Sequence, residues 1–399
     1  MAAVPRGLTA GPWPQTPPTD MTSLAYPHMR LDIDALNHNV QVMADWCTAH
    51  GVLLAPHAKT TMSHPIIGRQ AAAGAVAMTV ATAQQADTLL AWGHHRIIIA
   101  NEVVDAGALS LLRTRLKEDD GRSISIFIDS DEGLSAAQRV FAPPGPELQV
   151  LVEVGTPGGR AGVRDAAAAR RLAEKAARAT GVRLAGVAGY EGVVPNSRDA
   201  GTVAAVDLHC GRVRDVFGDV AGLFEVEAPI FSLGGSAFPD RVVRHLPALA
   251  EVPGARFILR AGCYVTHDHG IYASVGPIAG LVPAVTVRAV VLSVPEPGTA
   301  VVGAGKRELP YDAGLPMLLG AQSADRVPRH HAQGTVHRLF DHHAVLTGAA
   351  ELMVGDIIDL GISHPCSLFD RWDDYLVIDS SGTDVDIWST SFRRRTSNP

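Results

Sequence analysis

Residues 53–61, LLAPHAKTT, determine how the rest of the chain is interpreted. They form an apolar run that ends in Lys59, a pattern typical of the mouth of a buried strand. Burial favours the neutral amine of a lysine, whose lone pair can then attack a carbonyl, so Lys59 is a candidate Schiff-base nucleophile. The alternative is a solvated lysine at a strand end.

The remaining sequence repeats a strand-like apolar segment followed by a helix-like, Ala- and Leu-rich stretch. The strand-like segments are residues 52–59, 75–82, 96–102, 123–129, 148–154, 184–190, 230–235 and 257–264. Helix-like stretches between them include residues 84–92, 132–140, 165–180 and 203–216. Apolar strands that alternate with helices predict a parallel sheet covered by helices, and eight such units predict an α/β fold with a (β/α)₈ barrel.

The pattern changes at about residue 276. Short β runs separated by Gly and Pro follow, at residues 284–294, 299–303, 335–346, 356–362 and 375–379. Before the barrel, residues 30–34 predict a short strand, with Asp34 capping a helix through about residue 50. The expected organisation is a disordered leader (1–22), a cofactor-binding barrel (23–275), a C-terminal all-β domain carrying a metal site (276–392) and a tail (393–399).

Composition narrows the classes of partner. The 399 residues carry a net charge of −7, and the scattered basic residues favour neither nucleic acid nor an anionic membrane as partner. No apolar run reaches membrane-spanning length. The four cysteines lack CxxC spacing, and the first residues lack the pattern of an export signal, so a reducing, cytoplasmic location is expected.

Polar residues follow several predicted strands, at the barrel face where active sites form. Arg160, in a glycine-rich turn after the fifth strand, has a donor fork suited to an anionic oxygen. Gly234, Gly235 and Ser236 after the seventh strand offer backbone N–H groups and a hydroxyl to a phosphate. Gly262 and Tyr264 follow the eighth strand at the same rim. The alternatives are a surface arginine and ordinary tight turns.

A third candidate site is the triplet His364-Pro365-Cys366. In an extended chain alternate residues face the same way, so the imidazole and the thiol would project together. Such a pair suits Zn²⁺ or another borderline divalent ion and leaves coordination positions open. The alternative is a buried cysteine beside a capping histidine.

Taken together, these motifs resemble the D-threonine aldolase and D-serine dehydratase family of pyridoxal-phosphate (PLP) enzymes. The residues that carry the resemblance are PHAKT at 56–60, VAT at 80–82, GRAG at 159–162, GGS at 234–236, GCY at 262–264 and HPCSLFDRW at 364–372. It covers about residues 25–392. The first and last motifs are the most specific, because they match in order although they lie over 300 residues apart. The family shares an alanine-racemase type of barrel followed by a β domain.

The resemblance implies a role for each candidate residue. Lys59 would form the Schiff base with PLP and take the α-proton, and Arg160 would contact the phenolic oxygen of the ring. The other cofactor-binding residues implied are Tyr190, Gly234, Gly235, Ser236, Gly262 and Tyr264. His364 and Cys366 would bind Zn²⁺ or Mn²⁺ next to the substrate. Members of the family also imply a homodimer.

The chain departs from the family at one point. Many members continue the lysine motif with a histidine and a lysine, where this chain has Thr61-Met62. A base from that position is therefore in doubt. His267 and His269 are candidates to replace it, and solvated loop histidines are the alternative.

The implied substrate is a small D-amino acid with a β-hydroxyl group. Loss of the hydroxyl would give a 2-oxo acid and ammonia, whereas cleavage of the Cα–Cβ bond would give glycine and an aldehyde. Members with cysteine in the HxC position tend to be dehydratases, so Cys366 favours a D-serine or D-threonine type of dehydratase over an aldolase. A racemase would need no metal, and a non-catalytic PLP carrier would need no β domain.

Overall fold

In the computed structural model, residues 25–249 and 251–392 are described. The expected leader (1–22) and tail (393–399) lie outside the described residues. The described chain divides into two compact units. The barrel unit comprises residues 43–59 and 73–262, and the second unit comprises residues 25–42, 60–72 and 263–392.

The barrel unit contains a sheet of eight parallel strands in the order β2-β9-β8-β7-β6-β5-β4-β3. The strands are β2 (Leu53–Leu54), β3 (Met78–Val80), β4 (Arg96–Glu102), β5 (Ser123–Ile128), β6 (Leu148–Val154), β7 (Val182–Gly189), β8 (Ile230–Leu233) and β9 (Arg256–Leu259). The two edges are joined where Val76 N–H donates to the Leu54 carbonyl and Thr79 N–H donates to the Pro56 carbonyl, both at 2.9 Å. The predicted (β/α)₈ barrel is confirmed.

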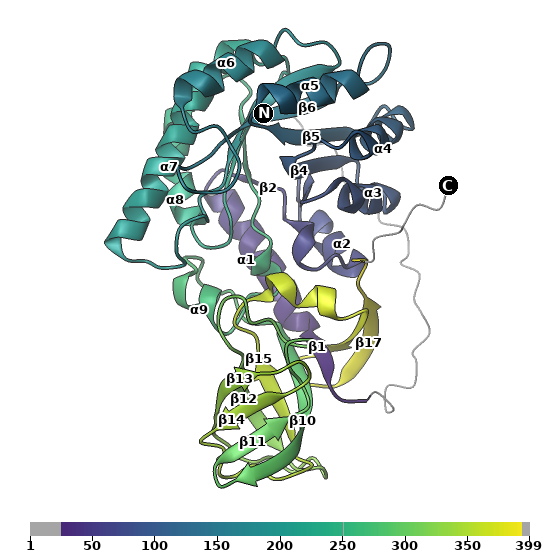
Figure 1. Cartoon of the computed structure of the whole chain (residues 1–399), viewed down its shortest axis with the longest axis vertical. Coiled ribbons are helices and arrows are strands. Elements are labelled where there is room, and N and C mark those ends of the chain that lie inside the picture. The colour runs from purple at the N-terminus through teal and green to yellow at the C-terminus, as the bar shows by residue number, and fades with distance from the viewer. Residues whose placement is uncertain (1–24, 250, 393–399) are drawn as a thin grey trace. The chain divides into compact units, whose positions relative to one another are not determined.

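Helices cover the outside of this sheet (Figure 1). They are α3 (Ala83–Ala91), α4 (Ala106–Lys117), α5 (Asp131–Val140), α6 (Ala166–Ala176), α7 (Ala200–Asp219) and α8 (Pro239–Val243). Five of them have an N-cap residue whose side-chain oxygen accepts a backbone N–H of the first turn. The N-cap residues are Thr82, Asp105, Ser130, Asp165 and Asp199. These caps satisfy donors that have no partner within the helix and fix where each strand-to-helix turn ends.

A mixed sheet of nine strands forms the second unit. Its strands are β1 (His28–Asp32), β10 (Val285–Glu296), β11 (Thr299–Val302), β12 (Met317–Gln322), β13 (Thr335–Leu339), β14 (Ala344–Thr347), β15 (Ile357–Gly361), β16 (Asp374–Ile378) and β17 (Asp384–Ser389). The run expected at 335–346 is a hairpin of two strands, and β12 and β17 had no counterpart in the sequence analysis. The predicted all-β region is confirmed as a sheet.

The N-terminal strand is the main difference from the expected organisation. Strand β1 pairs antiparallel with β10 and parallel with β16, so it belongs to the mixed sheet and not to the barrel. A sequence pattern identifies a strand but not its hydrogen-bonding partner, which here lies over 250 residues away.

The cap of the helix that follows, α1 (Ile33–Ala49), is also different from the prediction. Asp32 and not Asp34 accepts the backbone N–H groups of Asp34 and Ala35, both at 2.9 Å. The Asp34 carboxylate accepts the N–H of Ser380 instead. Both residues are acidic and only two positions apart, so composition alone could not separate them.

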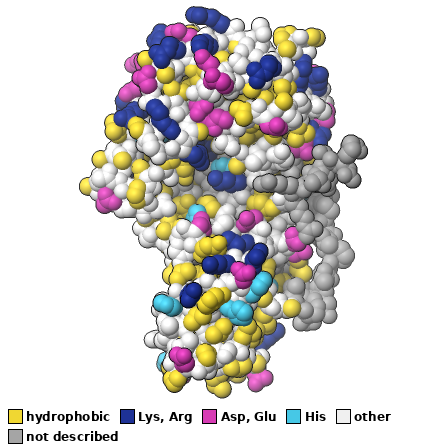
Figure 2. Space-filling view, viewed as in Figure 1, with side chains coloured by type: hydrophobic (Ala, Val, Ile, Leu, Met, Phe, Trp, Pro, Cys, Tyr) yellow, Lys and Arg dark blue, Asp and Glu magenta, His cyan; other side chains and the backbone are white. Residues whose placement is uncertain are grey.

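The charged side chains are interspersed on the face of the molecule shown in Figure 2, with both signs over the helices of the barrel. Within the described residues, no helix combines the length and the apolar character needed to cross a membrane.

Candidate active site

Lys59 lies in the 3₁₀ turn Ala58–Thr60, directly after strand β2 of the barrel, and is half-buried. Its neighbour His57 is fixed by its backbone N–H, which donates to the Ala261 carbonyl at 3.3 Å. Burial, together with the charges of Lys59, Arg260 and Arg160, holds the pKa of His57 well below its usual range. Lys59 and Arg160 therefore act electrostatically on the same imidazole, whose Nδ1 is buried without a hydrogen-bond partner.

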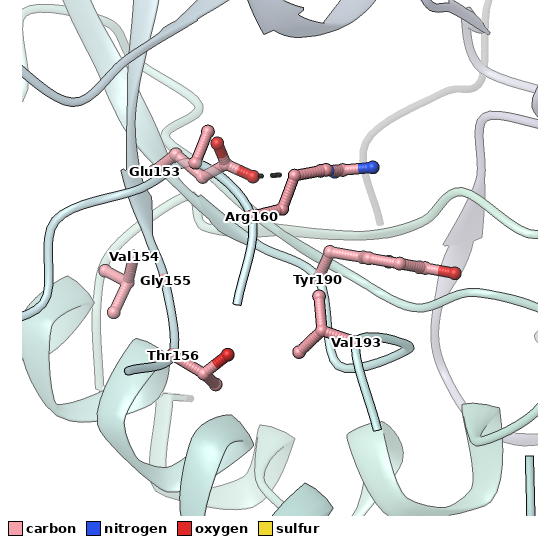
Figure 3. A pocket seen from close by; sticks show the side chains of 8 residues that line it. Glu153, Val154, Gly155, Thr156, Arg160, Tyr190 and Val193 are labelled. Atoms are coloured by element: carbon pink, nitrogen blue, oxygen red, sulfur yellow. Dashed lines mark ion pairs between the residues drawn. The ribbon is translucent and has the colours of Figure 1, made fainter. Parts of the chain in front are cut away.

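Arg160 and Tyr190 line one small pocket in the barrel unit (Figure 3). The Arg160 guanidinium lies over the Tyr190 ring, 5.1 Å from its centroid. Its Nη2 is 3.9 Å from Oε1 of the buried Glu153, the ion pair drawn as a dashed line. The structure thus brings together an arginine and an aromatic ring that the sequence analysis assigned to one cofactor.

Glu153, an acidic residue that lines this pocket, is buried at 3% exposure. Burial raises the pKa of Glu153 to about 8, and a hydrogen bond with Glu102 and its charge add to the shift. Arg160 and Arg260 act in the opposite direction but do not cancel it. The acid is therefore held largely protonated near neutral pH beside the guanidinium of Arg160.

The predicted phosphate cradle follows strand β8. Gly234 has φ +102°, and a Cβ atom there would lie 2.5 Å from Leu259, while one at Gly235 would lie 3.0 Å from Tyr190. The backbone conformation at Gly234 therefore favours glycine, and a side chain at Gly235 would require the Tyr190 ring to shift. The N–H groups of both glycines donate to the two carboxylate oxygens of the buried Glu191, at 3.1 and 2.6 Å.

The position of the Glu191 carboxylate indicates that this turn can bind an anion. It shows that two backbone donors converge on one anionic group, as phosphate binding requires. A phosphate on the same two donors would require the Glu191 side chain to turn away. The turn fits the phosphate of PLP in its donors and in the space that glycine leaves, and Ser236 follows it half-buried.

The two residues predicted after the eighth strand fall in different units. Gly262 ends the barrel unit, and Tyr264 belongs to the 3₁₀ turn Cys263–Val265 of the second unit. Tyr264 is 2% exposed, and its hydroxyl accepts a hydrogen bond from Gln70 Nε2 at 3.0 Å.

The second unit contains a cluster of three metal-ligating side chains. Cys263, His364 and Cys366 each offer one ligand atom, and these atoms lie within 4.8 Å of one another. The two sulfur atoms are 3.2 Å apart, and the two cysteines do not form a disulfide. The predicted pair of His364 and Cys366 does come together, and Cys263 joins it.

The local backbone differs from the extended chain that was expected. His364 is extended (φ −156°, ψ 122°), but Cys366 lies in the 3₁₀ turn Pro365–Ser367. Proline at the first position of that turn has the φ that the turn requires. The two side chains face the same cluster because the turn begins immediately after His364, not because the chain alternates.

A carboxylate orients the imidazole of this cluster. His364 Nδ1 is 2.8 Å from Asp312 Oδ2, which leaves Nε2 as the atom able to bind a metal. Burial alone would lower the pKa of His364, but the hydrogen bonds and charges of Cys263 and Asp312 raise it to about 9. The hydrogen bond with Cys366 is the main cause that holds the pKa of Cys263 well below its usual range, and His364 adds to it.

The two loop histidines proposed as substitute bases are not solvated. His267 is 8% exposed with φ 47°, and burial lowers its pKa. His269 is half-buried, its Nδ1 accepts the Ile362 N–H at 3.3 Å, and burial lowers its pKa to about 4. The expectation of solvated histidines is wrong, because both rings pack inside the second unit.

Cys263, Asp312 and Glu191 are among the residues of these sites that the sequence analysis missed. Cys263 stands within the quoted GCY motif, and a cysteine directly after a barrel strand was the available signal. Glu191 follows the predicted Tyr190 directly. Asp312 is separated from His364 by 52 residues and had no local signal.

A (β/α)₈ barrel with a lysine after its first strand, joined in one chain to a mixed β sheet, defines the alanine-racemase type of fold. Residues 31–238 match the family model described as "Alanine racemase, N-terminal domain", and residues 284–378 match the "Putative serine dehydratase domain". The chain belongs to the alanine racemase N-terminal domain family, and the predicted relation to D-threonine aldolase and D-serine dehydratase, a group of PLP enzymes, is confirmed.

Individual relatives agree with this assignment. The chain is 28% identical to a D-threonine aldolase of Arthrobacter sp over 97% of both chains. It is 28% identical to the D-threo-3-hydroxyaspartate dehydratase of Delftia sp. (strain HT23), over 74% of this chain and 75% of that protein. The crystal structure of D-threonine aldolase from Filomicrobium marinum superimposes with a TM-score of 0.76 at 27% identity, covering 93% of this chain and 96% of that chain.

Proposed function

We propose that this chain is a lyase, dependent on PLP and a divalent metal, that acts on D-amino acids with a β-hydroxyl group. The product we expect first is a 2-oxo acid with release of ammonia, as from D-serine or D-threonine. The observation that supports this is the Cys263, His364 and Cys366 cluster in a chain of a PLP family. A racemase has no use for a Lewis acid, whereas departure of a hydroxyl group does.

The described residues would hold the two groups in different ways. Lys59, Arg160, Tyr190, Gly234, Gly235, Ser236, Gly262 and Tyr264 would hold PLP, and His364 with Cys366 would hold Zn²⁺ or Mn²⁺. When bound, PLP supplies an electron sink for a bond broken at Cα, and the metal supplies a Lewis acid for the hydroxyl oxygen.

The remaining chemistry comes from the chain itself. The Lys59 amine would take the α-proton, and the Arg160 guanidinium would hold an anionic oxygen of the cofactor. The stacking of Arg160 on Tyr190 limits where that guanidinium can point. Asp312 would keep His364 oriented with Nε2 towards the metal.

Cleavage of the Cα–Cβ bond is the second candidate function. The D-threonine aldolase of Arthrobacter sp aligns with 97% of this chain, which supports it. An aldolase would have to remove the proton of the β-hydroxyl, and Thr61-Met62 stand where many family members have a histidine and a lysine that could do so. This departure and Cys366 support the dehydratase.

Product analysis separates the two functions. The purified protein, loaded with PLP and with Zn²⁺ or Mn²⁺, is incubated with D-serine, D-threonine and D-3-hydroxyaspartate. A 2-oxo acid with ammonia supports the dehydratase, and glycine with an aldehyde supports the aldolase. A chelator should abolish either reaction while PLP stays bound; full activity in a metal-free preparation would reject the metal.

We also propose a homodimer, as implied by the family resemblance, and a cytoplasmic location, which four cysteines without a disulfide support. Light scattering coupled to size-exclusion chromatography measures the assembly state directly.

A further inference from the structure

The strongest unassigned feature of the second unit is the position of Cys263 relative to the predicted metal pair. Its Sγ lies 3.2 Å from Cys366 Sγ, and Cys263 itself is 4% exposed. A lone buried cysteine is an ordinary core residue, but this one faces a second sulfur and an imidazole whose other nitrogen is already bonded to a carboxylate.

We propose that Cys263 is a third protein ligand of the metal, so that the chain binds Zn²⁺ through two thiolates and one imidazole. This inference rests on the proposed function, which assigns the metal to His364 and Cys366 alone. It adds the ligand number, the metal preference and the position left for substrate.

The geometry is compatible with one tetrahedral ion. At a Zn–S distance of about 2.3 Å, two sulfur atoms on a tetrahedral zinc lie about 3.8 Å apart. The observed separation of 3.2 Å is close to this value and well beyond the roughly 2.05 Å of a disulfide. A small rotation of either side chain would open the pair enough to admit the ion.

The surroundings of Cys263 suit a ligand that must stay in place. Thr60 Oγ1 lies 3.8 Å from its sulfur, and its 3₁₀ turn is closed by the His267 N–H, which donates to the Cys263 carbonyl at 2.8 Å. The centroid of the Tyr272 ring lies 5.8 Å from that of His364, so Tyr272 is next to the imidazole ligand. The cluster is therefore held by segments that lie far apart in the chain, around residues 60, 263–272 and 364–366.

Two chemical consequences follow from a Cys₂His ligand set. Thiolates favour Zn²⁺ over Mn²⁺ and Mg²⁺, which prefer oxygen, so the native metal should be zinc. Three protein ligands leave the fourth tetrahedral position for water or substrate, which is the arrangement of catalytic rather than structural zinc sites. The β-hydroxyl of the substrate is the group that this position would receive.

Zinc K-edge X-ray absorption of the PLP-loaded protein tests the ligand count. The wild type should show two sulfur neighbours, and Cys263→Ala and Cys366→Ala should each show one. Cys47→Ala, a buried cysteine of helix α1, is the matched control and should keep both. Two sulfur neighbours in a folded Cys263→Ala protein would overturn the proposal.

A metal competition supplies a second measurement that does not depend on the spectrum. Cys263→Ser should lower the affinity for Zn²⁺ by more than about tenfold while changing that for Mn²⁺ less, because only the soft ligand is lost. Equal losses for both ions would contradict the proposal. A wild type with zinc bound through one sulfur would reject Cys263 but keep the proposed function, whereas a wild type that binds no divalent ion would reject both.

Discussion

The polar groups of the barrel unit and those of the metal cluster are satisfied in different ways. In the barrel, each of these polar groups faces a protein partner: Glu153 lies beside Arg160, and Glu191 accepts the N–H groups of Gly234 and Gly235. In the second unit, two sulfurs and an imidazole, all of which can ligate a cation, face one another. The first arrangement supplies its own polar partners, while the second is best completed by a cation.

This difference teaches how far each site is prepared before its ligand binds. In the barrel, the N–H groups of Gly234 and Gly235 already donate to Glu191, so a cofactor phosphate would have to displace the Glu191 carboxylate to bind them. The metal cluster needs only deprotonation and a small opening of the two sulfurs. A substitution at one site should therefore leave ligand binding at the other site unchanged, so that PLP and zinc can be lost separately.

Lys59→Ala should have the largest effect. Loss of the amine should remove the visible absorbance of lysine-linked PLP and lower turnover by at least about 10³-fold, because the chain loses both the attachment point and the proton carrier. Zinc content should stay at the wild-type level. Lys175→Ala, an exposed lysine of the barrel unit paired with Asp131, is the control and should change neither property. An unchanged spectrum in Lys59→Ala would remove the cofactor assignment.

His364→Ala should produce the reverse pattern, with zinc lost and PLP absorbance retained. Turnover should fall by about 10²- to 10³-fold, since a Lewis acid contributes several kcal/mol to departure of a hydroxyl group. The matched control is His342→Ala, whose Nδ1 is 2.7 Å from Glu308 but whose ring is exposed. Metal analysis and absorbance measured on the same samples check the result, and joint loss of zinc and PLP would contradict independence.

Asp312→Asn should weaken metal binding without removing it. Replacing the carboxylate that orients His364 should lower zinc affinity by about 10- to 100-fold, the usual effect of a group that supports a metal ligand. Added zinc should restore most of the turnover. Glu308→Gln makes the same change beside the exposed His342 and should leave zinc affinity unchanged. If Asp312→Asn bound zinc as tightly as the wild type, the carboxylate would have no part in holding the ligand.

The fold was largely predictable because its signals are local. Each barrel strand is an apolar run a few residues long, followed by a helix that begins at a capping side chain such as Thr82 or Asp105, and both features can be identified within a short window. Strand β1 shows the limit, since its partners β10 and β16 are set by packing between distant segments. No window of the sequence contains that pairing.

The candidate sites show the same division. Lys59 and the His364-Cys366 pair were predictable because the residues that reveal them are neighbours in the chain. Cys263 is 103 residues from Cys366, and only folding brings their sulfurs together. Asp312 and Glu191 act through hydrogen bonds to groups far along the chain, so residue type alone could not distinguish them from the many acids of the surface.

The smallest expected effect concerns Glu153 and tests whether this buried acid is protonated beside Arg160 or ionised as its counter-charge. Burial raises the pKa of Glu153 from 4.5 to about 8, with Glu102 acting in the same direction and Arg160 and Arg260 in the other. The folded protein therefore binds this proton more tightly than the unfolded chain. The stability that it contributes is present below about pH 4.5 and is lost as the pH rises through about 8.

Glu153→Gln cannot ionise and should not show this loss. The free energy of unfolding of the variant, relative to the wild type, should therefore increase by about 1 kcal/mol or more between pH 5 and pH 8.5. Urea denaturation of cofactor-free protein at both pH values measures it, with the exposed Glu132→Gln of helix α5 as the control. If the difference in the free energy of unfolding between Glu153→Gln and the wild type did not depend on pH, Arg160 and Arg260 would keep Glu153 ionised. The barrel pocket would then contain a salt bridge and not a protonated acid.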